Sequence, residues 1–208
     1  MTQSNKEITK ASYEATASEF ALNVAKLAPI NSIEEFLSLL PAKAKILDLG
    51  CGSGRDAKIF TEFGAEVVGI DFSANLIEIA KGHAPRAKFA LMDIENMDLA
   101  ENTYDGVWAV CSLTHIAKKE LPNVLKKIHL LLKEDGYFYL ALKKGSGEVL
   151  EQDKRYEGEH KKFWSFFTED EIRRFLQEAH FNVVDFAEVE KNSPYQTHSA
   201  FRIFCQKS

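Results

Sequence analysis

The chain has 208 residues, enough for one well-buried domain and too few for two domains of full size. Apolar residues make up 45% and charged residues 27%, which excludes a disordered, collagen-like or membrane-embedded composition. The 26 lysines and arginines against 31 aspartates and glutamates give a net charge of -5, so a protein that mainly neutralises nucleic-acid phosphates is disfavoured.

The first predicted elements are two N-terminal helices. Apolar side chains between residues 7 and 27 recur at a spacing of one helical face, and they are Tyr13, Ala17, Phe20, Val24 and Leu27. A second helix is predicted to begin at Ser32, because Ser32 and Glu35 have the spacing of a capping box, and it must stop by Pro41. Residues 1–42 are thus expected to form N-terminal cap helices in front of a core at 43–208.

Five short apolar runs follow, separated by amphipathic stretches. They are typical of strands buried on both faces and lie at 46–49, 67–70, 88–92, 107–110 and 137–142. Helical patterns occupy the intervals at about 55–63, 73–81 and 118–133. Alternating strands and helices predict an α/β fold in which a doubly wound, mostly parallel sheet carries helices on both faces.

Residues 143–167 show no clear periodicity, and a segment of this length at a sheet edge is expected to be a lid-like insertion. We interpret its mixed charges as a solvated surface; the residues concerned are Lys143, Lys144, Lys154, Arg155, Lys161, Lys162, Glu148, Glu151, Asp153, Glu157 and Glu159. Its aromatic residues are expected mainly to anchor the segment to the core, and they are Phe163, Trp164, Phe166 and Phe167.

The C-terminal part predicts one more helix and two strands. Thr168 and Glu171 have the spacing of a capping box, followed by a buried helical face that ends near Ala179. Only nine residues separate the last two predicted strands, 181–189 and 199–206, which is too few for a parallel crossover. We therefore expect a seven-stranded sheet that ends in an antiparallel hairpin, within a single domain over 1–208.

A glycine-rich turn follows the first predicted strand, at residues 48–54 with the sequence Asp-Leu-Gly-Cys-Gly-Ser-Gly. Such a turn between strand and helix lets a ligand approach the backbone, although a tight turn alone can also require glycine. Asp71 and Asp93 end the next two strands. Because the carboxyl ends of parallel strands meet at one edge, Asp48, Asp71 and Asp93 are expected to converge on one crevice.

The charge of this crevice distinguishes between nucleotide cofactors. Cofactors that carry a pyrophosphate usually bind at Gly-x-Gly-x-x-Gly, whereas the spacing here is Gly50-x-Gly52-x-Gly54 and Asp48 would repel a phosphate. A cofactor with a sulfonium cation and an amino group suits an acidic pocket better. The residues therefore favour S-adenosylmethionine as the cofactor.

With Asp-x-Gly-x-Gly-x-Gly as its first motif, the chain from about residue 43 to the C-terminus resembles the class I, Rossmann-like S-adenosylmethionine-dependent methyltransferases of the small-molecule type. This resemblance implies that Asp48 and the turn at 50–54 hold the methionine half, Asp71 the ribose, and Asp93 the adenine amino group with Ile94 nearby. One departure is His180, where relatives commonly have glycine; histidine tolerates a positive φ at such a position.

The full set of cofactor-binding residues that the resemblance implies is Asp48, Gly50, Cys51, Gly52, Gly54, Asp71, Phe72, Leu76, Asp93, Ile94 and Cys111. Phe72 and Leu76 would flank the adenine, although an apolar residue at either position equally suits packing of a helix on the sheet. His115 directly follows the fourth strand and is the candidate general base; its alternative roles are to line the pocket or to cap the next helix.

Candidate contacts to the methyl acceptor are Tyr13, Phe20, Arg155, Tyr156 and His160. Residues 192–195, Asn-Ser-Pro-Tyr, are similar to the Asn-Pro-Pro-Tyr of amino-group methyltransferases, but they lie in the terminal hairpin instead of after the fourth strand, so we assign them no role. The cysteines, Cys51, Cys111 and Cys205, form no Cys-x-x-Cys pair, so neither a metal site nor a disulfide is expected.

We expect a cytoplasmic enzyme with a small-molecule acceptor, no nucleic-acid partner and no membrane segment, since the chain shows neither a targeting signal nor a long apolar run. Three alternatives stay open: methylation of a protein or RNA, a non-catalytic cofactor-binding scaffold, and an NAD-dependent oxidoreductase. The sequence predicts neither the acceptor, nor the atom that is methylated, nor the oligomeric state.

Overall fold

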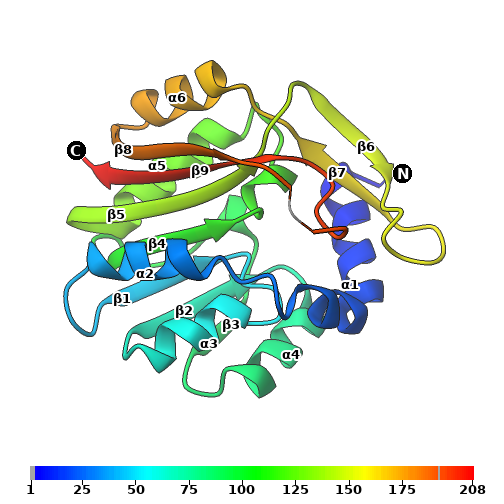
Figure 1. Cartoon of the computed structure of the whole chain (residues 1–208), viewed down its shortest axis with the longest axis horizontal. Coiled ribbons are helices and arrows are strands. Elements are labelled where there is room, and N and C mark those ends of the chain that lie inside the picture. The colour runs from blue at the N-terminus through cyan, green and yellow to red at the C-terminus, as the bar shows by residue number, and fades with distance from the viewer. Residues whose placement is uncertain (1–2, 192) are drawn as a thin grey trace.

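The computed structural model describes residues 3–191 and 193–208. The strands of its main sheet are β1 (Lys45–Leu49), β2 (Glu66–Asp71), β3 (Lys88–Leu91), β4 (Tyr104–Val110), β5 (Leu132–Lys143), β8 (Phe181–Val189) and β9 (Ala200–Lys207). They lie in the order β3-β2-β1-β4-β5-β9-β8 (Figure 1). β1 to β5 pair in parallel, and β9 pairs antiparallel with both β5 and β8. The predicted α/β fold, with its seven-stranded sheet and C-terminal antiparallel hairpin, is confirmed.

Helices cover both faces of this sheet (Figure 1). α2 (Ile30–Ser38) and α3 (Arg55–Glu62) pack on one face, with α4 (Ala74–His83) beside α3, and α5 (Leu121–Leu131) and α6 (Glu169–Glu178) pack on the other. Successive strand residues alternate between the two cores: Trp108 packs on the side of α2, and its neighbours Val107 and Ala109 on the side of α5. Both cores meet the sheet, which explains why the strands are apolar on both faces.

The two predicted capping boxes have different outcomes. At α6, the Thr168 hydroxyl accepts from the Glu171 amide and the Glu171 carboxylate accepts from the Thr168 amide, as predicted. The prediction for Ser32 is wrong, because α2 begins at Ile30 and has no side-chain cap. Ser32 is instead buried within the helix and its hydroxyl is bonded to Tyr139.

α1 (Asn5–Val24) lies at the edge of the molecule, across from the carboxyl ends of the parallel strands (Figure 1). Its Glu14 carboxylate accepts hydrogen bonds from the Ala74 and Asn75 amides and the Ser73 hydroxyl, all at the N-terminus of α4. A carboxylate is favoured there because the N-terminal end of a helix is partly positive. Within the described ranges, no helix combines the length and apolar character that a membrane span needs.

The segment 143–167 contains a second, two-stranded sheet, in which β6 (Glu148–Gln152) pairs antiparallel with β7 (Lys161–Ser165). The sequence patterns did not predict this sheet, because residues 143–167 show no clear periodicity. The interpretation of its charges as a solvated surface is wrong for three residues: Lys143 is 8% exposed, Asp153 4% and Lys162 0%. Asp153 lies 2.9 Å from the Lys162 ammonium, and this pairing lets a lysine occupy a buried strand position that looks like surface in the sequence.

Candidate functional site

A cavity of about 250 Å³ lies at the carboxyl edge of the parallel strands, beneath α1 and beside β7. Most of the predicted site residues line it, namely Tyr13, Phe20, Asp48, Gly50, Cys51, Gly52, Asp71, Phe72, Leu76, Asp93, Ile94, Cys111, His115 and Arg155. Of the two predicted N-terminal helices, only α1 contributes to this lining. The structure thus brings together side chains from α1, the strand ends and the β6–β7 hairpin.

Gly54, Tyr156 and His160 do not belong to the lining. Gly54 precedes α3 with a φ of +76°, and a Cβ there would lie 3.1 Å from Ala80, so glycine permits α3 and α4 to approach each other. Tyr156 is buried behind the cavity wall, where its hydroxyl lies 2.5 Å from that of Tyr195. His160 packs edge-on against Tyr156.

Gly50 is required at the start of the glycine turn by both conformation and space. Its φ is +68°, a region that side chains rarely adopt, and an added Cβ would lie 2.4 Å from the Ser112 Cβ. The Gly50 amide donates to the carbonyl of Ile70, which joins the turn to β2. The turn therefore passes close to the segment after β4, and both line the cavity.

We expect Gly50→Ala to lower the free energy of unfolding by at least about 1–2 kcal/mol, the cost of a left-handed conformation, with the Ser112 contact adding to it. Thermal unfolding followed by circular dichroism measures the change. Gly82→Ala is the matched control, because a Cβ on this helical glycine meets nothing within 4 Å. If the Gly50 variant were as stable as the Gly82 variant, the described turn geometry would be wrong.

Asp71, the last residue of β2, connects the glycine turn to α4. Its two carboxylate oxygens accept hydrogen bonds from the Gly52 amide at 3.0 Å and from the Ser73 amide at 2.9 Å. Burial raises the pKa of Asp71 to about 6, and backbone hydrogen bonds from Ser73, Gly52 and Phe72 oppose that rise. The carboxylate is thus held at the cavity wall by backbone groups, with no cationic side chain bonded to it among the described residues.

Asp48 is 3% exposed, and its Oδ2 atom has no hydrogen-bond partner in the described part of the chain. Burial and the nearby Asp56 carboxylate raise the pKa of Asp48 well above its usual value. Asp56 is satisfied, since Arg55 contacts both of its oxygens and the Trp108 indole donates to one of them. A buried carboxylate without a partner is costly, so a cationic or hydrogen-bond-donating ligand would relieve Asp48.

Asp93, two residues after β3, has a partner that the sequence patterns did not reveal. The Lys6 ammonium of α1 lies 2.6 Å from it, and the Glu95 amide and Asn96 side chain also donate to it. Burial opposes ionisation, but these contacts together lower the pKa of Asp93. Lys6 and Asp93 both line the cavity, so this ion pair joins α1 to the strand edge.

His115 and Tyr13 form a hydrogen-bonded pair in the cavity lining. The His115 Nδ1 atom lies 2.7 Å from the Phe163 carbonyl, which can only accept, so Nδ1 carries the proton. Nε2 then accepts from the Tyr13 hydroxyl at 2.9 Å. Burial and the nearby cations of Lys162, Lys143 and Arg155 lower the pKa of His115 to about 3. His115 is therefore a neutral imidazole near pH 7.

The cavity lining also contains residues that the sequence patterns missed or assigned elsewhere. Lys143 ends β5, and its position at a strand end was the available signal for it. Trp164, expected to serve packing, is buried and also lines the cavity. Tyr195, to which the sequence patterns assigned no role, lines the cavity too; Asn192 lies outside the described residues.

Residues 46–136 match a family model described as a methyltransferase domain. A ubiquinone biosynthesis O-methyltransferase from Rhodopseudomonas palustris is 35% identical over 101 residues, covering 47% of this chain and 39% of that protein. A solved structure of an S-adenosylmethionine-dependent methyltransferase from Methanosarcina mazei matches this chain with a TM-score of 0.75 and 23% sequence identity. The match covers 86% of this chain and 97% of the Methanosarcina chain. The 1,6-didemethyltoxoflavin-N1-methyltransferase of Burkholderia thailandensis, solved with 1,6-didemethyltoxoflavin and S-adenosylhomocysteine, has a TM-score of 0.75 and 22% identity, covering 100% of this chain and 92% of its own.

These comparisons confirm the expected resemblance: residues 46–136 match a methyltransferase domain, and the chain has the fold of S-adenosylmethionine-dependent methyltransferases. The chain spans half or less of the length of the curated relatives that it matches. The shared region holds the glycine turn and the ends of β2 and β3.

Proposed function

We propose that this chain, with its class I methyltransferase domain, methylates a small-molecule acceptor at the expense of S-adenosylmethionine. The observation that carries this proposal is the acidic wall of the cavity, where Asp48 has an unpartnered buried oxygen and Asp71 is held only by backbone amides. When bound, S-adenosylmethionine supplies an activated methyl group on a sulfonium cation. An acidic, partly unsatisfied wall fits a cationic donor and disfavours a pyrophosphate.

The residues present fit this cofactor. In the proposal Asp48 and the glycine turn hold the methionine half, and the Asp71 carboxylate accepts hydrogen bonds from the ribose hydroxyls. Asp93 accepts from the adenine amino group, which requires it to share the Lys6 contact or give it up. The apolar contacts to adenine come from Phe72, Leu76 and Ile94.

Methyl transfer is a displacement at an already activated carbon, so the main tasks of the protein are to position the acceptor and exclude water. Aromatic side chains of α1 and β7 line the cavity, and they are Tyr13, Phe20 and Trp164. The pKa of about 3 makes His115 too weak a base to take a proton from the acceptor, so in this proposal neutral His115 and the Tyr13 hydroxyl bonded to it orient the acceptor, and any proton that the acceptor releases leaves to water. The fixed Nδ1 proton keeps Nε2 as the acceptor.

A small molecule is favoured over a protein or RNA because the cavity lies under α1 and β7, and the net charge of -5 does not suit an RNA partner. Among the relatives, the names of the ubiquinone biosynthesis and toxoflavin enzymes also indicate small acceptors. The proposal includes a cytoplasmic location, where the free thiols of Cys51, Cys111 and Cys205 stay reduced.

Thermal unfolding in the presence of S-adenosylhomocysteine or NADH tests the proposal against an oxidoreductase. We expect the melting temperature to rise only with S-adenosylhomocysteine, because a ligand that binds the native state raises its apparent stability. Stabilisation by NADH alone would contradict the proposal. Incubation with S-adenosylmethionine and a cytosolic metabolite extract separates an enzyme from a scaffold, since only an enzyme accumulates S-adenosylhomocysteine.

Cofactor affinity is expected to depend on pH through Asp71. Hydrogen bonds from ribose hydroxyls need the ionised carboxylate, and burial raises the pKa of Asp71 to about 6. The dissociation constant of S-adenosylhomocysteine should therefore be nearly constant above about pH 7 and rise by up to about tenfold per pH unit below about pH 6. Calorimetric titrations across this range, with circular dichroism to verify folding, measure it. Equal affinity on both sides of the Asp71 pKa would contradict this role.

A further inference from the structure

The cavity lining carries carboxylates at β1 and β2 and a lysine at the end of β5, which lies two strands further along the sheet from β1. The end formed by the glycine turn is lined by Asp48 and Asp71, which have no cationic side chain bonded to them among the described residues. The other end, which we call the basic end, is lined by Lys143, Arg155, Trp164, Tyr195 and His198. The proposed cofactor occupies the acidic wall, so the basic end is left for the acceptor.

Lys143 is a buried ammonium without a carboxylate partner in the described part of the chain. Its Nζ atom donates to the Thr197 hydroxyl at 2.7 Å and lies 3.4 Å from the centre of the Trp164 ring. Burial and the neighbouring Arg155 cation lower the pKa of Lys143 to about 8, which still leaves it mostly charged at neutral pH. A hydroxyl and an aromatic face compensate a buried charge only in part.

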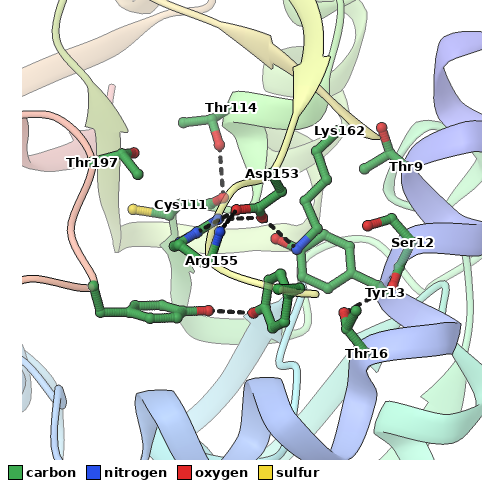
Figure 2. Close-up of polar contacts among 12 residues, drawn as sticks. Thr9, Ser12, Tyr13, Thr16, Cys111, Thr114, Asp153, Arg155, Lys162 and Thr197 are labelled. Atoms are coloured by element: carbon green, nitrogen blue, oxygen red, sulfur yellow. Dashed lines mark hydrogen bonds and ion pairs between the residues drawn. The ribbon is translucent and has the colours of Figure 1, made fainter. Parts of the chain in front are cut away.

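Arg155 belongs to a second group of charges, together with Asp153 and Lys162, shown in Figure 2. Asp153 accepts from the Arg155 guanidinium through both oxygens at 2.7 Å, and it also lies 2.9 Å from the Lys162 ammonium. One buried carboxylate thus serves two cations, and the group keeps a positive charge. Glu151 is the other carboxylate whose charge favours protonated Lys143. It is exposed on β6, where solvent screens its attraction to Lys143.

Flat aromatic side chains form the remaining walls of the basic end. Arg155 lies 4.5 Å from the centre of the Tyr195 ring and 5.6 Å from that of Trp164, so the cation is close to both rings. Tyr13 and Phe20 pack edge to face on the side of α1. Such walls suit a planar ligand, and the unbalanced positive charge suits an anion.

We propose that the methyl acceptor is a planar aromatic acid that binds as an anion, with its acidic group against Lys143 and Arg155. This inference rests on the proposed function and names the substrate class of the same site. An anion there neutralises a buried positive charge and places the aromatic ring among Trp164, Tyr195 and Tyr13, next to the Tyr13–His115 pair. A cationic acceptor would be repelled by the same groups.

Calorimetric titration of the protein saturated with S-adenosylhomocysteine tests this inference. The probes are benzoate, 2-hydroxybenzoate and indole-3-acetate, each compared with its neutral carboxamide. We expect at least one acid to bind saturably and at least about tenfold more tightly than its amide, because truncating one partner of a buried charge contact costs more than that. Lys143→Met should weaken acid binding by at least about tenfold.

Lys144→Met is the matched control, since the adjacent Lys144 is exposed and pairs with Glu188 away from the cavity. It should bind the acid as the wild type does, and saturable binding of S-adenosylhomocysteine by both variants shows that they are folded. Amides that bind as tightly as the acids, no saturation by any acid at millimolar concentration, or an unaffected Lys143 variant would each overturn the inference. Failure of the proposed function is separate, because it appears as absent S-adenosylhomocysteine binding before any acid is added.

Discussion

Asp71→Ala is expected to weaken binding of S-adenosylhomocysteine at least about 100-fold, because two hydrogen bonds to a charged acceptor contribute about 1.5–3 kcal/mol each. The substitution removes the proposed ribose contacts and also frees the Gly52 and Ser73 amides that the carboxylate holds. The glycine turn then loses its tie to α4. Isothermal titration calorimetry at neutral pH measures the loss of affinity.

Asp105→Ala is the matched control for this experiment. Asp105 also accepts a backbone amide, that of Lys45, and it pairs with Lys133. It lies near the start of β4 and outside the cavity lining, so its loss should leave the affinity for S-adenosylhomocysteine unchanged. An Asp71 variant that binds this ligand as tightly as the Asp105 variant would show that the ribose assignment is wrong.

Phe36→Ala is expected to lower the free energy of unfolding by about 3–5 kcal/mol, the usual cost of removing a buried aromatic side chain. Phe36 of α2 is 0% exposed. Its ring centre lies 5.2 Å from that of Trp108 and 6.1 Å from that of Phe60. The ring packs directly over Gly106, where an added Cβ would lie only 2.7 Å from it. Urea denaturation measures the change.

Phe63→Ala provides the comparison, because Phe63 follows α3 and is 61% exposed. Its loss should change the free energy of unfolding by no more than about 0.5 kcal/mol. Similar small effects at both positions would show that α2 does not belong to the core. A large effect at Phe36 alone supports the observed division of the N-terminal helices, in which α1 covers the cavity and α2 packs on the sheet.

The sheet could be predicted because its strands are marked by local composition. Val107 and Trp108 face opposite cores, so both are apolar, and this makes a buried parallel strand visible as an uninterrupted run. The position of Asp71 followed from topology alone, since the carboxyl ends of parallel strands share one edge. The antiparallel pairing of β8 and β9 followed from the short connection between them. His180 has a φ of 59°, as the expected departure from glycine required.

The basic end of the cavity could not be predicted, because it depends on contacts between residues distant in sequence. Lys162 is 0% exposed in β7 only because Asp153 pairs with it across the hairpin, and composition shows nothing of this pairing. Tyr195 reaches the cavity from the β8–β9 connection, whose path is set by tertiary packing. The contact of Lys6 with Asp93 likewise joins two residues that are distant in sequence, one in α1 and one just after β3. Local patterns therefore located the acidic wall of the cavity better than its basic end.

In the proposed function, the acidic wall of the cavity binds a cationic adenosyl donor. Calorimetric titration of the wild-type protein with S-adenosylmethionine and with S-adenosylhomocysteine is the most direct test of this binding. We predict saturable heats for both ligands and competition between them for one site per chain. Absence of saturable heat with either ligand at millimolar concentration, from protein shown to be folded, would contradict the assignment of Asp48 and Asp71 to cofactor binding.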